Sequence, residues 1–245
     1  MKKLYVIGIG PGGKERMTQE ALAAIEKSDV IVGYTPYLEY VKEYIKDKET
    51  FTSGMRKEVE RCQKAIDFAR EGKTTSILST GDAGLYGMAG PILELLKGDE
   101  EVQVEIVPGV SSVFSAAAEL GAPVMHDLAI ISLSDLMTPW DLIQKRIDLA
   151  AQGDFVISLY NPRSKGRPDH LQTAIEIILK HKSPDTPVGV VKNSGRANKE
   201  QWVTTLKELD YEKVDMLTIL IIGNKASYID GDKIITPRGY EIWSG

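Results

Sequence analysis

Short apolar runs alternate with amphipathic stretches along the first half of this chain. The apolar runs are typical of buried strands and occupy residues 4–9, 30–32, 75–78 and 102–107. Apolar positions spaced three or four apart predict helices over residues 18–27, 55–70, 89–96 and 113–120, the first of them capped by Thr18. Because strands and helices alternate, the first half is predicted to be an α/β domain with a largely parallel sheet.

The pattern changes after residue 121. Residues 121–137 carry Gly, Pro and Asp without a clear period, and we expect a hinge there. Beyond it, we expect helices over residues 140–150 and 169–180 and strands over residues 155–159, 188–191, 201–206, 217–222 and 233–235. The last strands follow one another with little helix between them, which favours a mixed, partly antiparallel sheet. The fold class predicted is therefore α/β, with two α/β domains at residues 1–121 and 122–245.

Composition narrows the class of protein. The chain has 245 residues, of which 42% are hydrophobic and 27% charged, as in ordinary globular proteins. No apolar run approaches the roughly 20 residues that span a bilayer, and the first residues predict a strand rather than a signal peptide. We therefore expect a cytoplasmic protein without a membrane partner. A net charge of −5 argues against nucleic acid as the main partner.

Metal and disulfide chemistry find little support. The single cysteine, Cys62, excludes an internal disulfide and an iron–sulfur cluster built from this chain's own cysteines. It falls on an apolar stripe with Val59, Ile66 and Ala69, which predicts a small core residue. The three histidines are scattered without the spacing of metal ligands, so no metal site is expected.

A glycine-rich loop follows the third predicted strand. Residues 79–90 are Ser-Thr-Gly-Asp-Ala-Gly-Leu-Tyr-Gly-Met-Ala-Gly. In open α/β sheets ligands bind at the carboxyl ends of the strands, and glycines let the backbone approach a ligand closely. The same loop also suits a plain connection between a strand and a helix. Asp82 within it is either a turn residue or an acceptor for a ligand's hydroxyl or amine.

Two more loops follow predicted strands. Residues 8–13 match the G-x-G-x-x-G pattern of nicotinamide-binding domains. That pattern requires an acid at the end of the second strand, where this chain has Gly33 and Tyr34, and Pro11 restricts the turn. An oxidoreductase is therefore retained only as an alternative. Ser111 and Ser112, after a Pro-Gly-Val turn, can cap a helix or bind a polar ligand at its N-terminus.

Basic side chains gather in loops of an otherwise acidic chain. They are Arg56, Lys57, Arg163, Lys165, Arg167, Lys192, Arg196 and Arg238. Arg offers paired donors to carboxylates and Lys offers a mobile charge, so these loops suit a substrate rich in carboxylates. A solvated basic surface is the alternative.

Taken together, the loops resemble those of the tetrapyrrole (class III) S-adenosylmethionine-dependent methyltransferases, and the resemblance covers nearly the whole chain. It rests on the turn at residues 8–12, the Gly-Asp loop with Tyr86, and residues 108–112. The stretches at residues 81–90, 159–164, 191–196 and 222–224 resemble the members that methylate C17 of a cobalamin precursor. Many relatives have Gly-Asp-Pro where this chain has Gly-Asp-Ala, and the Ala is what the C17 enzymes show.

The resemblance implies a site and an activity. It implies S-adenosylmethionine bound in a cleft between two α/β domains of a homodimer. The implied cofactor contacts are Pro11, Gly81, Asp82, Ala83, Leu85, Tyr86, Ser111, Ser112, Tyr160, Asn161, Gly189 and Gly223. The implied reaction is C17 methylation with ring contraction of cobalt-factor III or precorrin-3B. Asp82, Lys192 and Arg196 are the candidates to polarise the substrate, and Arg56, Arg163, Lys165 and Arg167 are the candidates to bind it.

Three alternatives stay open at this point. A sister enzyme could methylate another position of the macrocycle, the residue 8–13 turn could serve a nicotinamide cofactor, or the basic loops could carry a tetrapyrrole without catalysis. Positioning of the methyl group opposite the macrocycle carbon can contribute on the order of 7–11 kcal/mol at best, whichever position is methylated.

Overall fold

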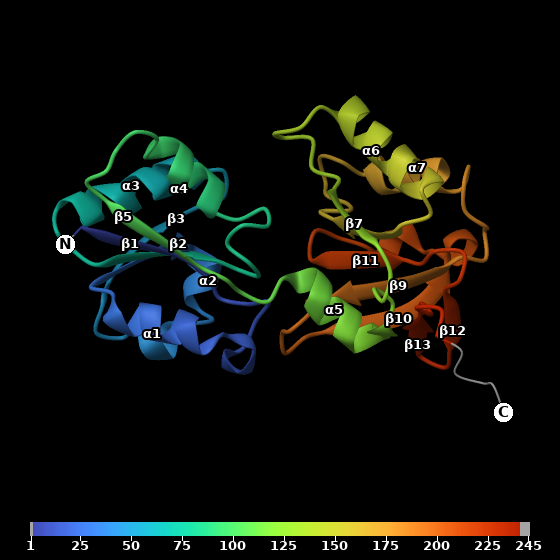
Figure 1. The fold of residues 1–245 in the computed structure, drawn as a ribbon, viewed down its shortest axis with the longest axis horizontal. Coiled ribbons are helices and arrows are strands. Elements are labelled where there is room, and N and C mark those ends of the chain that lie inside the picture. The colour runs from blue at the N-terminus through green and yellow to red at the C-terminus, as the bar shows by residue number, and fades with distance from the viewer. Residues whose placement is uncertain (1, 241–245) are drawn as a thin grey trace. The chain divides into compact units, whose positions relative to one another are not determined.

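The computed structural model describes residues 2–240, which divide into two compact units, one ending at Ser112 and the other beginning at Val113 (Figure 1). This division comes earlier than the domain boundary predicted after residue 121. The reason is α5 (Ser112–Leu120), whose apolar face packs against strand residues of the second unit, among them Val156 and Val191. The two units are described separately as unit 1 and unit 2.

Unit 1 contains a parallel five-stranded sheet in the order β3-β2-β4-β1-β5. Its strands are β1 (Lys3–Gly8), β2 (Val30–Tyr34), β3 (Glu49–Ser53), β4 (Thr75–Ser79) and β5 (Gln103–Val107). Its helices are η1 (Lys14–Arg16), α1 (Gln19–Lys27), α2 (Thr35–Leu38), η2 (Lys42–Tyr44), α3 (Glu58–Arg70) and α4 (Ala89–Leu95). The predicted cap is confirmed, because the Thr18 side chain accepts a hydrogen bond from the Ala21 amide.

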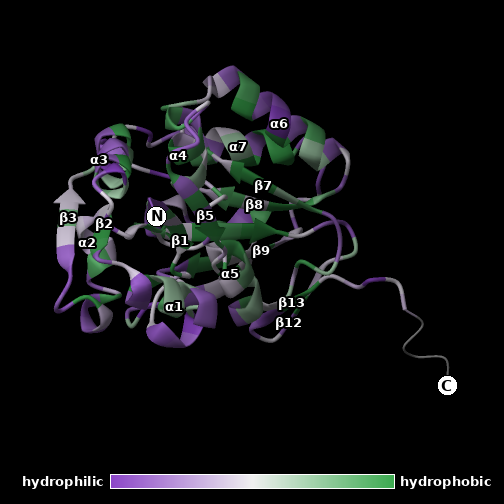
Figure 2. Cartoon of the chain, turned by 60° about the vertical axis from the view of Figure 1, so that its left-hand side comes forward, coloured by the Kyte–Doolittle hydropathy of each residue, from purple (hydrophilic) through white to green (hydrophobic). Residues whose placement is uncertain are grey.

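Alternation along the strands gives unit 1 two buried faces. Leu4 and Val6 of β1 belong to the core formed with α3 and α4, whereas Tyr5 and Ile7 belong to the core formed with α1 and α2. In Figure 1, α3 and α4 accordingly lie on one side of this sheet and α1 on the other. Figure 2 shows hydrophilic and hydrophobic stretches alternating along α1 and α3, as expected for helices with one face on a sheet.

Unit 2 contains a mixed five-stranded sheet in the order β10-β9-β11-β8-β7, in which only β7 and β8 are parallel neighbours. Its strands are β7 (Leu128–Ser132), β8 (Val156–Tyr160), β9 (Pro187–Lys192), β10 (Glu200–Thr205) and β11 (Thr218–Ile222). A small sheet joins β6 (Gly121–Ala122), β13 (Lys233–Ile235) and β12 (Tyr228–Asp230). The helices are α5, α6 (Trp140–Gln152), α7 (His170–Ile178), η3 (Leu206–Glu208) and η4 (Tyr211–Lys213). The partly antiparallel sheet predicted for the second half is confirmed.

Two local expectations were wrong, and one strand was missed. The predicted hinge contains β6 and β7, because the apolar run of residues 128–131 pairs in parallel with β8. Val59 was expected in the buried stripe of α3, but it is 63% exposed and lies in the first turn of that helix. The sequence analysis made no prediction for β3, whose alternating polar residues leave it largely exposed at the sheet edge. Cys62, Ile66 and Ala69 are buried as predicted.

None of the helices within residues 2–240 is long and apolar enough to cross a lipid bilayer.

Candidate functional site

Three loops of unit 1 meet at the carboxyl edge of its parallel sheet, and we call them the glycine edge: residues 8–12, 79–84 and 107–112. Gly10 and Gly81 exchange backbone hydrogen bonds of 3.1 and 2.7 Å, which join the loop after β1 to the loop after β4. A Cβ on Gly109 would lie 2.2 Å from the Gly81 oxygen and 2.5 Å from the Gly8 oxygen. Glycine is therefore required because three backbones approach too closely for a side chain.

The Asp82 side chain stabilises this edge by accepting hydrogen bonds from two backbone amides. One carboxylate oxygen accepts a hydrogen bond from the Gly109 amide at 3.0 Å, and the other accepts one from the Gly84 amide at 2.8 Å. Since Gly109 belongs to the loop after β5, the Asp82 side chain connects two of the three loops. The carboxylate retains further lone pairs for a ligand's hydroxyl or ammonium group.

The other residues predicted in unit 1 lie on the same loops. Ala83 is fully buried, Pro11 and Ser111 are buried, and Leu85 and Ser112 are partly buried. Tyr86 has a φ of 56°, a conformation uncommon outside glycine, and its side chain is 54% exposed. Backbone strain of this kind often occurs at functional positions.

The nicotinamide alternative finds no matching acid. Strand β2 ends in Gly33 and Tyr34, whereas Asp29 precedes it and accepts a hydrogen bond from the Thr74 amide at 2.8 Å. That carboxylate therefore lies at the amino end of the strand, away from the edge where a dinucleotide's ribose would bind.

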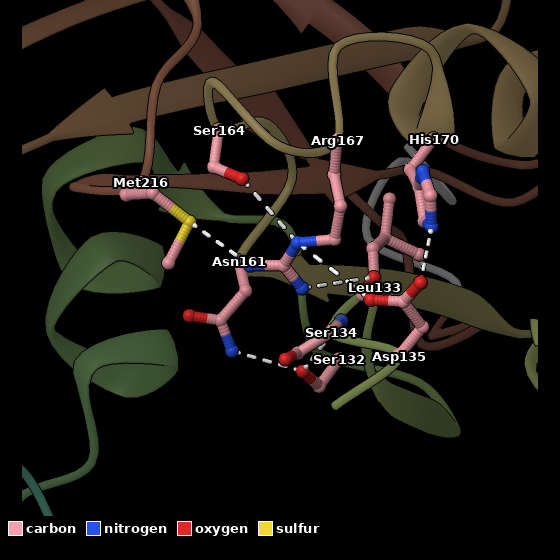
Figure 3. A network of polar contacts seen from close by, with 9 residues as sticks. All are labelled: Ser132, Leu133, Ser134, Asp135, Asn161, Ser164, Arg167, His170 and Met216. Atoms are coloured by element: carbon pink, nitrogen blue, oxygen red, sulfur yellow. Dashed lines mark hydrogen bonds and ion pairs between the residues drawn. The ribbon is translucent and has the colours of Figure 1, made fainter. Parts of the chain in front are cut away.

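Unit 2 has its own polar edge, which we call the arginine edge: residues 132–137, 160–167 and 215–217 (Figure 3). The Arg167 guanidinium donates to the Ser164 hydroxyl at 3.3 Å and to the Leu133 carbonyl at 3.4 Å, and it lies 3.5 Å from the Met216 sulfur. Its Nε is also 3.9 Å from a carboxylate oxygen of Asp135. One largely buried cation thus connects three loops.

Two residues predicted to contact the cofactor belong to unit 2 strand ends. The Tyr160 hydroxyl accepts a hydrogen bond from the Val113 amide at 2.9 Å, at the start of α5. Asn161 has a φ of 52° and donates to the Ser132 hydroxyl at 2.9 Å. Tyr160 and Asn161 therefore order the ends of α5, β7 and β8.

The two predicted glycines of unit 2 have packing reasons for their lack of a side chain. A Cβ on Gly189 would lie 2.4 Å from a methyl group of Leu120, and Gly189 pairs within the sheet with Val203 and Ile221. A Cβ on Gly223 would lie 2.5 Å from Cβ of Ser227.

The basic side chains predicted to bind substrate have different surroundings. Arg163 is tied to η4 by an ion pair of 2.6 Å with Glu212 and a hydrogen bond to the Tyr211 carbonyl, while Arg167 turns toward Leu133 and Met216. Lys165 is exposed. Arg56, in unit 1, is exposed and has a φ of 62°.

Lys192, proposed above to polarise the substrate, has a structural partner. Its ammonium lies 2.7 Å from Asp215, and this hydrogen bond raises the pKa of Lys192. Burial acts to raise the pKa of Asp215, but hydrogen bonds from Lys192, the Leu217 amide and Thr218 outweigh it, so the pKa of Asp215 is lowered. The Arg196 amide donates to the Asn193 carbonyl at 3.0 Å, which closes the adjacent turn.

A surface hollow of about 430 Å³ adjoins this ion pair. It is lined by Lys192, Glu200, Trp202, Glu212, Lys213 and Asp215. Three of these side chains are carboxylates, which disfavours the hollow as a site for a polyanion.

Comparison with known proteins assigns the family. Residues 3–210 match the model of the Tetrapyrrole (Corrin/Porphyrin) Methylases. The chain belongs to this family. The methylase is 49% identical to the "Probable cobalt-factor III C(17)-methyltransferase" of Salmonella typhimurium, over 98% of this chain and 100% of that protein. It is also 47% identical to the "Cobalt-factor III methyltransferase" of Priestia megaterium, over 98% of this chain but only 45% of that longer protein.

A solved structure agrees with the two-domain fold. The methyltransferase CobJ superposes on the methylase with a TM-score of 0.89 at 32% identity, covering 96% of this chain and 99% of that one. The predicted fold class is confirmed, and so is the family resemblance.

Sequence reasoning did not consider four residues at the arginine edge of this methylase. Ser132 and Asp135 were passed over because residues 121–137 were assigned to a hinge, and Trp140 and His170 because they lie in predicted helices. The available signal was the apolar run before Ser132, which repeats the strand-then-polar-loop pattern seen after β8.

A second omission is Arg61. It is 3% exposed, donates to the Ser53 hydroxyl at 3.1 Å and the Gly54 carbonyl at 2.9 Å, and lies 5.7 Å from the ring of Tyr34. These contacts fix the turn that follows β3.

Within residues 2–240, no group of three or more His, Cys, Asp or Glu side chains could hold a metal ion.

Proposed function

We propose that this methylase transfers a methyl group from S-adenosylmethionine to C17 of cobalt-factor III and contracts the macrocycle. The observation that carries the proposal is the 49% identity, over the full length of the relative, with a protein named for this reaction. The metal-free counterpart precorrin-3B is the second substrate, retained because the described residues offer no feature that recognises cobalt. Cobalt would enter as part of the substrate.

The glycine edge supports the choice of cofactor. S-adenosylmethionine offers hydroxyl and ammonium donors and a carboxylate, and bound there it supplies an activated methyl group on a sulfonium. Asp82 and the loop carbonyls provide acceptors, and Ser111 and Ser112 provide hydroxyls at the start of α5. We assign cofactor contacts to Pro11, residues 81–86 and Ser111–Ser112. The contacts assigned to Tyr160, Asn161, Gly189 and Gly223 rest on the family resemblance.

The protein's contribution to the reaction is position and exclusion of water. The hydrogen bonds between Gly10 and Gly81 and between Asp82 and Gly109 fix the glycine edge before any ligand arrives. Such preorganisation avoids the cost of ordering loops during binding. Arg56 and Lys165, which are exposed, are proposed to meet substrate carboxylates.

The closest competing function is methylation of another macrocycle position. Purified protein is incubated with methyl-labelled S-adenosylmethionine and with cobalt-factor III or precorrin-3B in separate reactions. We expect a product heavier by one methyl group, with the label at C17 and a contracted ring. A label at another carbon supports a sister enzyme, and no transfer with bound macrocycle supports a carrier.

Cofactor identity is tested separately by calorimetry. We expect binding of S-adenosylhomocysteine and none of NADPH, and the reverse result supports an oxidoreductase. Homodimer formation, which the resemblance implies, is tested by the mass of the native protein in solution.

A further inference from the structure

His170 is held on two sides at the arginine edge. It is the first residue of α7, and its Nε2 lies 3.3 Å from the Asp135 carboxylate (Figure 3). The Trp140 ring, at the start of α6, lies 4.0 Å from the imidazole ring between centroids. The histidine side chain is 18% exposed and the Asp135 side chain 36%, so the pair is restrained yet reachable.

The charged groups around this imidazole come from two loops. Asp135 belongs to the loop after β7, and Arg167, from the loop after β8, approaches the other oxygen of the same carboxylate. Helix α6, which packs against α7, presents the Trp140 ring. Asp135 is thus fixed from both sides and can stabilise a positive charge on His170.

The loop that carries Asp135 also has an exposed apolar tip. Met137 is 94% exposed and Leu136 is 61% exposed. Exposed large apolar side chains next to a restrained polar pair are suited to a flat ligand with an apolar face and polar edges, such as a tetrapyrrole.

We propose that the His170 imidazole accepts the proton that the macrocycle loses when it is methylated, with Asp135 as its positioning residue. This proposal rests on the proposed function. The same edge was predicted above to bind substrate through Arg167, whereas here Arg167 supports the loop that carries Asp135.

The need for a base follows from the electron count. When the new carbon–carbon bond forms, it uses an electron pair of the macrocycle, and the broken carbon–sulfur bond leaves its pair on sulfur. The macrocycle therefore gains a methyl group and one positive charge. Loss of one proton from the macrocycle to the imidazole nitrogen restores its charge, and the imidazolium later releases that proton to water. The methyl transfer and the proton loss together change no oxidation state of the macrocycle.

A second histidine–carboxylate pair, farther along the chain from the arginine edge, provides the control. His181 Nε2 lies 2.8 Å from Asp148, so His181 also pairs with a carboxylate, but it follows the far end of α7. His181→Gln therefore removes a comparable histidine without touching the arginine edge.

The first test needs no substrate. The imidazole signals of His170 and His181 are compared by NMR at one pH in the wild type and in Asp135→Asn. We expect the His170 ring signals to change in Asp135→Asn, because the carboxylate that holds the ring is lost, and the His181 signals to stay unchanged. Unchanged His170 signals would show that Asp135 does not position it, and would overturn the proposal.

The second test is kinetic. We expect His170→Gln to lower kcat by about 10²-fold and to remove the loss of activity at acidic pH, as for a general base. Binding of S-adenosylhomocysteine should change less than about threefold, since His170 is not among the residues assigned to the cofactor, and His181→Gln should match the wild type. A His170→Gln enzyme with wild-type kcat and pH profile would overturn the proposal. If the wild type itself transfers no methyl group to either tetrapyrrole, the proposed function fails, and the NMR result still decides the pairing.

Discussion

The two units join the loops at their sheet edges by opposite means. In unit 1 a carboxylate, Asp82, accepts hydrogen bonds from backbone amides, and glycine backbones contact each other directly. In unit 2 a guanidinium, Arg167, donates to a carbonyl and a hydroxyl, and side chains fill the space between loops. At the glycine edge the loops contact each other mainly through their backbones. At the arginine edge a side chain makes the contacts between loops.

Sheet topology explains the difference. Unit 1 is parallel throughout, so the loops after β1, β4 and β5 all emerge at one edge. In unit 2 only β7 and β8 are parallel, and the third loop of the arginine edge precedes β11, which runs antiparallel to β8. The parallel sheet brings three backbones together and demands glycine, whereas the mixed sheet leaves room that a long side chain must bridge.

Gly109→Ala should have the largest effect. A Cβ would lie 2.2 Å from the Gly81 oxygen, and because backbone on both sides resists displacement, we expect a loss of about 3 kcal/mol or more in unfolding free energy. S-adenosylhomocysteine binding should be lost as well. Chemical denaturation and calorimetry measure the two effects.

Gly90→Ala is the matched control for that change. Gly90 lies in α4, and no atom lies within 4 Å of its added Cβ, so this variant should gain roughly 0.5–1 kcal/mol from helix propensity. Equal stability of the two alanine variants would contradict the close approach at the glycine edge.

Arg167→Met tests the arginine edge. It leaves the Leu133 carbonyl without its donor and removes a side chain that is 11% exposed, so we expect a loss of about 1–3 kcal/mol. Arg163→Met removes an ion pair whose Glu212 side chain is 80% exposed and should destabilise the protein less than Arg167→Met does. If both variants unfold at the same denaturant concentration, Arg167 does not hold these loops.

Asp82→Asn tests whether Asp82 contributes to cofactor binding as well as to stability. The amide keeps the shape of the side chain but has one acceptor oxygen where the carboxylate has two, so one backbone amide loses its partner. We expect a cost of about 1–2 kcal/mol and about tenfold weaker S-adenosylhomocysteine binding. Asp29→Asn is the control. The Asp29 carboxylate also accepts a hydrogen bond from a backbone amide, that of Thr74 at 2.8 Å, and its loss should leave the affinity for S-adenosylhomocysteine unchanged in calorimetry. Equal weakening in the two variants would remove the special role of Asp82.

The smallest expected effect is the pH dependence of stability that comes from Cys62. Reaction of this buried thiol also measures the opening of unit 1. Burial raises the pKa of its thiol to about 11 from the usual 9.0. The folded state therefore keeps its proton while the unfolded state ionises, so this residue's contribution to stability falls as the pH rises from about 9 to 11. At pH 8 a thiol reagent should label the native protein only through opening of the core.

Labelling rates also compare the two edges. Because Cys62 is the single cysteine and lies in unit 1, Gly109→Ala should speed its labelling, and Arg167→Met should not. Equal acceleration by both would mean that the edges do not stabilise separate units.

The sequence predicted the alternation of elements, the Thr18 cap and the glycine loops, because each depends on residues close together in the chain. It could not predict that Asp82 would reach Gly109, 27 residues away, since that contact exists only once β1, β4 and β5 are aligned. Counting basic loops placed Arg163 and Arg167 among the candidates for binding substrate. In the structure Arg163 contacts Glu212 and Arg167 contacts the Leu133 carbonyl. These partners come from distant segments, and a sequence pattern does not reveal such contacts.

The hinge was misplaced for a related reason. Gly121 and Pro123 are turn formers, but the apolar run that follows them pairs with β8, and tertiary pairing outweighs local signals. Because β7 was not recognised, the sequence could not predict that Asp135 and His170 are neighbours.

The central claim is that the glycine edge holds the cofactor. A crystal structure of the protein with S-adenosylhomocysteine tests it most directly. We predict that the ligand contacts residues 81–86 and Ser111–Ser112, with a hydrogen bond to the Asp82 carboxylate or to the backbone beside it. A ligand bound away from these loops would contradict the account.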